Sequence, residues 1–208
     1  MNFHPHRYEA LEVISRQVIS KYDPRLLYAP APIPVECIME EIGLTIEFQY
    51  LRKNGRVLGE TVFEDAMIPI YERENNEGYK LIPVKAGTVL IDASLIHNRG
   101  DGRFRYTCAH ELSHWVIDKN YFMALGEQSA AMMKKAARSS ETGAAIERQA
   151  NRMASCLLMP KGVLKKAFYQ AYPNAKNIAA TLAAQFGVSR QAMEIRLEEL
   201  GLLPKHTI

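Results

Sequence analysis

In the stretch Thr107-Cys108-Ala109-His110-Glu111-Leu112-Ser113-His114-Trp115-Val116-Ile117-Asp118, two histidines stand four residues apart and a glutamate directly follows the first. Residues four apart on an α-helix lie one turn above each other, so His110 and His114 can direct their imidazoles at one metal ion. Glu111 would lie beside that ion, where a base acting on water is needed. The alternative is an accidental spacing on a solvated surface helix. The apolar flanks favour a buried helix, in which unpaired polar side chains are costly, and so they favour a zinc site.

The composition describes an ordinary globular protein rather than a fibrous, disordered or membrane one. The 208 residues are 48% hydrophobic and 24% charged, which fits one domain or a domain with a small appendage. The net charge of +3 is too mild to indicate a nucleic-acid or membrane partner. No apolar run approaches the roughly 20 residues that span a bilayer. The N-terminus lacks signal-peptide features, and three widely spaced cysteines fit reduced thiols, so we expect a cytoplasmic protein.

Hydrophobic periodicity predicts a β-rich first half and a helical second half. Asn54-Gly55 predicts a hairpin that joins the first two strands. The class is therefore α+β, with a small antiparallel β-sheet packed on a helical bundle that carries the zinc site. We expect an N-terminal helix and Pro-rich connector over 1–34, a metallopeptidase domain over 35–172 and a helix-turn-helix-like segment over 173–208. The predicted helices span 8–21, 35–41, 103–119, 144–159, 161–172, 175–186 and 189–200, and the predicted strands 44–50, 57–63, 66–71, 79–84 and 88–91.

A hydrolytic zinc site needs a third protein ligand and an open position for water. Asn120 stands where one common arrangement has a third histidine, so a carboxylate from a later helix is the alternative. Glu147 is the best candidate, and Glu141 stays open on position alone. Asn151 lies one turn beyond Glu147 and could accept the free ring N–H of a ligating histidine. Four further residues have weaker cases. Asp118 is an outer partner or a surface residue, His97 lines the cleft or is solvated, and the thiols of Cys108 and Cys156 are bystanders.

Two longer motifs enclose these residues. The segment 103–114, RFRYTCAHELSH, resembles R-x-R-F-T-x-A-H-E-L-G-H, and the segment 147–160, ERQANRMASCLLMP, resembles E-x-x-A-N-x-F-A-x-x-L-L-M-P. These are motifs of the ImmA/IrrE family of zinc metallo-endopeptidases, which is found in bacteria and their mobile elements; the tail from Phe186 to Leu202 also fits. The departures are Tyr106, Ser113 and Met153, and Asp118 replaces a histidine of many members. The resemblance covers most of the chain.

The resemblance implies that Zn²⁺ is held by His110, His114 and Glu147, that Glu111 is the catalytic base, and that the substrate is a cytosolic protein such as a helix-turn-helix repressor. For the donor that stabilises the oxyanion, the candidates are Arg105, Tyr106, His97 and Tyr121. Two other classes compete. Residues 178–197 have helix-turn-helix periodicity, but Ser189–Leu200 holds two arginines against three glutamates, which argues against DNA. A non-catalytic partner-binding module is the other, although it would have no chemical reason to keep Glu111. Residues 121–142 could form a substrate-recognising flap or a surface helix.

Overall fold

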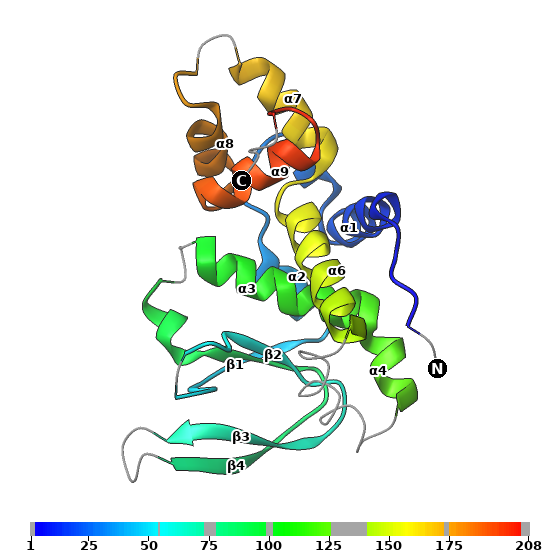
Figure 1. The fold of residues 1–208 in the computed structure, drawn as a ribbon, viewed down its shortest axis with the longest axis vertical. Coiled ribbons are helices and arrows are strands. Elements are labelled where there is room, and N and C mark those ends of the chain that lie inside the picture. Colours follow the sequence, from blue (N-terminus) through cyan, green and yellow to red (C-terminus); the bar gives the residue numbers. More distant parts are fainter. Residues whose placement is uncertain are drawn as a thin grey trace.

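The protein combines a helical layer with two small β-sheets, as the α+β prediction expected. The computed structural model describes residues 3–53, 55–72, 78–98, 102–125, 141–172 and 175–204. Helices occupy one end of the molecule, and the β3–β4 hairpin lies at the other end (Figure 1). The helices are α1 (Tyr8–Tyr22), α2 (Val35–Glu41), α3 (Gly102–Ser113), α4 (Lys119–Leu125), α6 (Glu141–Leu158), α7 (Lys161–Ala171), α8 (Ile178–Phe186) and α9 (Arg190–Glu199).

The larger sheet is mixed, so the prediction of a single antiparallel sheet was wrong. Strand β5 (Thr88–Asp92) lies in its centre, parallel to β1 (Thr45–Gln49) and antiparallel to β2 (Gly59–Thr61). The hairpin expected at Asn54-Gly55 does not form between β1 and β2, because β5 is inserted between them. All five residues of β5 are buried, and its hydrogen bonds to both neighbours make it the better partner for each. Strands β3 (Ala66–Glu72) and β4 (Gly78–Val84) form a separate antiparallel pair.

The helix predicted over 103–119 is present but is not uniform. After α3 the backbone forms a π-helical turn, His114–Asp118, and α4 follows directly. Such turns are rare and occur often at functional sites. The segment 126–140, which includes most of the predicted flap or surface helix, lies outside the described residues. Helix α3 crosses α6, and the two share a core with α1, α2 and the sheet. The crossing of α3 and α6 is therefore the feature that positions any site between them.

The C-terminal helices pack on this core rather than standing apart. Helix α8 begins at Ile178, later than predicted, because the Asn177 side chain accepts a hydrogen bond from the Ala180 amide and so caps it there. Gly187 ends α8 with φ +63°, a conformation that favours glycine. The Arg105 side chain donates to the carbonyls of Gly187 and Ile33, both at 2.9 Å. These bonds fasten the turn between α8 and α9 to α3. No helix in the described ranges is long and apolar enough to cross a membrane.

Candidate metal centre

The two histidines of the HExxH motif lie where α3 passes into its π-helical turn. The Nε2 atoms of His110 and His114 are 3.0 Å apart, and the two rings are nearly perpendicular, at 87°. His114 is buried, and the His110 side chain is 16% exposed. Both Nε2 atoms therefore approach one point near the protein surface, as the helical spacing predicted.

Helix α6 brings Glu147 to the same point. One carboxylate oxygen lies 3.3 Å from His110 Nε2, and the other lies 3.8 Å from His114 Nε2. His110, His114 and Glu147 form a cluster that could hold a metal ion, with ligand atoms within 4.8 Å of one another. It is the one such cluster of histidine, cysteine and carboxylate side chains within the described residues. Glu141 is exposed at the start of α6, and His97 is exposed in the 3-10 helix Ala93–Asn98, so neither joins the cluster.

Each histidine has an acceptor on its other ring nitrogen. His114 Nδ1 lies 2.8 Å from the carboxylate of Asp118, which is fully buried and also accepts a 2.6 Å hydrogen bond from the Gln149 side chain. His110 Nδ1 lies 3.1 Å from the side-chain oxygen of Asn151. Because a carboxylate and an amide oxygen are acceptors, each ring donates through Nδ1 and keeps a lone pair on Nε2. Asn151 thus lies where the sequence predicted, and Asp118 is an outer partner rather than a surface residue.

This arrangement fits a divalent cation. Tetrahedral bonds of about 2.0–2.1 Å from zinc to its ligands would place the donor atoms roughly 3.3–3.4 Å apart. The two Nε2 atoms, 3.0 Å apart, and the 3.3 Å contact of His110 with Glu147 are close to this spacing, and the 3.8 Å between His114 and Glu147 would shorten on binding. Two lone pairs and a carboxylate that converge at these distances repel one another unless a cation or a proton lies between them. Two imidazoles and one carboxylate leave a coordination position open, whereas structural zinc sites are closed by four ligands.

A proton on His110 can also reduce the repulsion between these groups. Burial lowers the pKa of His110, but the hydrogen bond to Glu147 and the negative charges of Glu111 and Glu147 outweigh it, and the pKa lies above its ordinary value. Negative charge that favours a protonated imidazole also favours a bound cation. The electrostatics of the cluster, like its geometry, therefore favour a metal site.

Glu111 is held by strand β2, which the motif alone did not indicate. Its carboxylate accepts a 2.7 Å hydrogen bond from the Thr61 hydroxyl, and both side chains are buried. A Cβ built on Gly59 would lie 2.6 Å from both Cγ and Oε1 of Glu111. Gly59 thus leaves the space that the Glu111 side chain fills. A signal was available in Gly59-Glu60-Thr61, since a glycine in a strand marks a close approach by another group.

The four candidate oxyanion donors differ in what their side chains contact. Arg105 is committed to two carbonyls, His97 is exposed, and Tyr121 packs edge-on against Phe3 and Phe122. The Tyr106 hydroxyl donates to the Asn151 side chain at 3.0 Å and so lies beside His110. Burial, with the charge of Glu199, raises the pKa of Tyr106 to about 12, which keeps this hydroxyl a donor. Cys108 and Cys156 are both buried in the core, as expected of bystanders.

Comparison with known proteins agrees with this site. A family model described as the IrrE N-terminal-like domain of Peptidase M78 matches residues 95–198, half of the chain. The chain belongs to this M78 family. The matched region begins before α3, ends in α9 and contains His110, Glu111, His114 and Glu147. The resemblance found in the motifs is thus confirmed.

Individual proteins give only a weak likeness. Among solved structures the chain is similar to a Mycobacterium tuberculosis transcriptional regulator, with 15% identity and a TM-score of 0.46. The likeness covers 91% of this chain and 47% of the regulator, so the chain spans about half the length of that structure. No curated protein matches.

Proposed function

We propose that this protein is a zinc-dependent endopeptidase that cuts a cytosolic regulatory protein, such as a helix-turn-helix repressor. The convergence of His110, His114 and Glu147 around one open point, with Glu111 beside it, supports the proposal most directly. Membership of the M78 peptidase family supports it independently. The repressor as substrate rests on the ImmA/IrrE resemblance alone.

The side chains of the site have separable roles in this mechanism. When bound, zinc supplies Lewis-acid activation of a water and of the scissile carbonyl. Glu111 accepts the proton of the attacking water and passes it to the leaving amine. Thr61 and Gly59 fix the Glu111 carboxylate, and Asp118 and Asn151 orient the two imidazoles. Tyr106 is the candidate donor to the developing oxyanion, by rotation of its O–H away from Asn151, whose side-chain oxygen would keep the hydrogen bond from His110.

The test separates metal binding from chemistry. Zinc-loaded protein is incubated with repressors encoded beside its gene, and the products are mapped by mass spectrometry. We expect the Glu111→Gln variant to keep its zinc and lose cleavage, and the His110→Ala variant to lose the metal. Full activity of Glu111→Gln would refute the assignment of the base.

DNA binding by α8 and α9 is less well supported than catalysis. Of the two arginines in α9, Arg196 is fully buried and contacts Glu12, Tyr8 and the Met159 carbonyl. Arg190 is paired with Glu194 at 2.7 Å. Arg196 is thus closed to a phosphate backbone, which requires exposed positive charge, and the charge of the exposed Arg190 is balanced by Glu194. This observation favours packing as the role of α9.

A further inference from the structure

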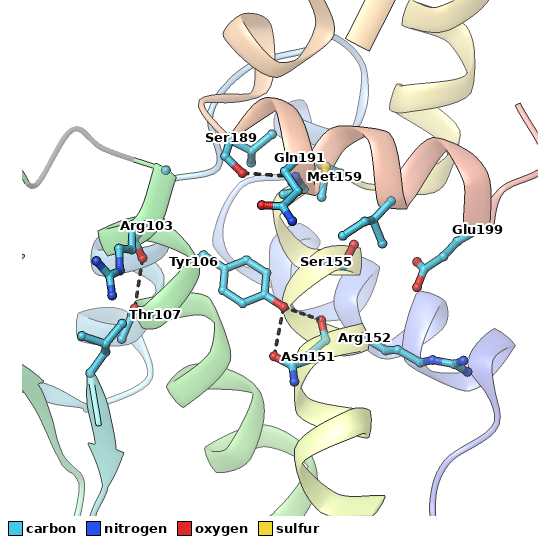
Figure 2. Close-up of a pocket in the computed structure, with 15 residues that line it drawn as sticks. Arg103, Tyr106, Thr107, Asn151, Arg152, Ser155, Met159, Ser189, Gln191 and Glu199 are labelled. Carbon is cyan, nitrogen blue, oxygen red and sulfur yellow. Dashed lines mark hydrogen bonds between the residues drawn. The ribbon is translucent and has the colours of Figure 1, made fainter. Parts of the chain in front are cut away.

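A cavity of about 510 Å³ lies beside the metal centre, between α3, α6 and α9. In Figure 2, Tyr106 lies near the middle, with Asn151 below it; Ser189, the N-cap of α9, and Gln191 on α9 lie above. A volume of this size lies within the range of pockets that bind ligands, roughly 300–1,000 Å³. The space is thus large enough for several side chains of a bound molecule.

The cavity adjoins the metal centre at Asn151, the hydrogen-bond partner of His110. Tyr106 and Asn151 line it, and Asn151 also contacts the His110 ring. Ser155, one turn further along α6, lines it too. At 1.5 Å per residue along the helix, Asn151 and Ser155 lie about 6 and 12 Å from the level of Glu147. A chain cut at the metal centre therefore reaches the cavity if it runs parallel to α6.

The walls of the cavity are largely apolar. Leu58, Met159, Val188, Ala192 and Ile195 contribute them, and Ile195 is 51% exposed despite its size. Charged side chains also line it: Arg103, Arg152 and Glu199. Apolar walls with a few polar groups are suited to apolar side chains whose backbone stays hydrated or hydrogen-bonded.

We infer that this cavity is the specificity pocket for a peptide substrate and accepts an apolar side chain about two to four residues from the scissile bond. The spacing follows from the extent of an extended peptide, about 3.3 Å per residue, over the 6–12 Å between the levels of Glu147 and Ser155. This inference rests on the proposed function, since it takes the metal centre as the place of cleavage. It adds the substrate feature that the pocket selects.

The test uses a library of peptides randomised at every position. Zinc-loaded wild-type protein is assayed for cleavage, and the zinc-loaded Glu111→Gln variant for capture of peptides, which are then sequenced. We expect both the cleaved and the captured peptides to be enriched in an apolar residue. In the cleavage products this residue should lie at one fixed position, two to four residues from the cut. Binding by Glu111→Gln does not depend on hydrolysis, so the pocket is tested even if no peptide is cut.

Two matched pairs of variants locate the preference. Ile195→Glu places a carboxylate on the pocket wall, and Val13→Glu makes the equivalent change on α1, where Val13 is also 51% exposed. Ala192→Phe fills the pocket, and Ala184→Phe adds the same ring at an exposed position of α8 outside it. We expect Ile195→Glu and Ala192→Phe to lower kcat/KM for the selected peptides by about 10-fold or more, and the two controls to match wild type.

Each outcome decides between the two proposals. Cleavage with no positional preference, or a preference that Ile195→Glu and Ala192→Phe leave unchanged, overturns the pocket and keeps the peptidase. Capture with an apolar preference but no cleavage overturns the peptidase and keeps the pocket. Neither cleavage nor selective capture overturns both.

Discussion

The space that Gly59 leaves for Glu111 gives the sharpest prediction for catalysis. In the Gly59→Ala variant the new Cβ would lie 2.6 Å from Cγ and from Oε1 of Glu111. Carbon atoms in ordinary contact lie about 3.5–4.0 Å apart, so one group must move by roughly 1 Å. The Gly59 backbone is fixed by its pairing with Ile91 on the buried central strand, whereas Glu111 meets the new Cβ with side-chain atoms, which can move by rotation about their bonds. The carboxylate is therefore expected to move.

A displacement of about 1 Å at a catalytic group can cost roughly 100-fold in rate, which corresponds to about 2.7 kcal/mol of transition-state stabilisation. We expect Gly59→Ala to lower kcat/KM by that factor, measured on a peptide selected from the library. Zinc content, measured by elemental analysis, should equal that of wild type, since the three atoms nearest to the new Cβ all belong to Glu111 and not to a candidate ligand.

Gly162→Ala is the matched control. Gly162 lies in α7, and a Cβ there would have no neighbour within 4 Å. This variant should keep wild-type activity and gain up to about 1 kcal/mol of stability from the better helix propensity of alanine. If Gly59→Ala cleaved as fast as Gly162→Ala, with its zinc intact, the placement of Glu111 by β2 would be refuted.

Four other changes test the remaining contacts. Thr61→Val should lower kcat about 10-fold with little change in KM, since a hydrogen bond to a charged group contributes about 1.5–3 kcal/mol, and Thr61→Ser should restore it. Asp118→Asn should weaken zinc affinity about 10–100-fold in a competition with a chelator; unchanged affinity would contradict its orienting role. Zinc affinity should fall on acidification, starting above pH 6.5, because the raised pKa of His110 lets protons compete at higher pH than at an ordinary histidine. Arg196→Met should lower the free energy of unfolding in urea by about 3–5 kcal/mol, because it leaves Glu12 buried without its partner; Arg190→Met, at an exposed pair, should cost less than about 1 kcal/mol.

The sequence predicted the cluster well because its geometry is mostly local. The spacing of His110 and His114 fixes their relative position on any helix, and the one-turn spacing of Glu147 and Asn151 does the same on α6. What joins the two helices is tertiary packing, which no local pattern encodes. For that reason Glu141 stayed open on spacing alone, and the structure, which leaves it exposed, was needed to set it aside.

The sheet was predicted less well because strand pairing is not local. Asn54-Gly55 is a good hairpin signal, yet β1 and β2 both pair with β5. Thr45 of β1 pairs with Thr88, and Glu60 of β2 pairs with Leu90, so the partners are far apart in the chain. The fully apolar middle of β5 indicated a strand buried on both faces, and such a strand is normally central. The same non-local arrangement brings Gly59 and Thr61 to Glu111, so these two contacts could not be predicted from the motif.

The residues of the candidate metal centre are connected to one another by hydrogen bonds that cross between α3 and α6. Helix α6 supplies Glu147, the third candidate ligand. It also supplies Asn151, which accepts from His110, and Gln149, which donates to Asp118. The π-helical turn supplies Asp118 itself, whose carboxylate links His114 to Gln149. Helix α6 thus orients His110 directly, through Asn151, and His114 indirectly, through the hydrogen bond of Gln149 to Asp118. Free energy gained on binding a metal here would therefore stabilise the α3–α6 crossing itself, and loosening that crossing would weaken the site without touching a ligand.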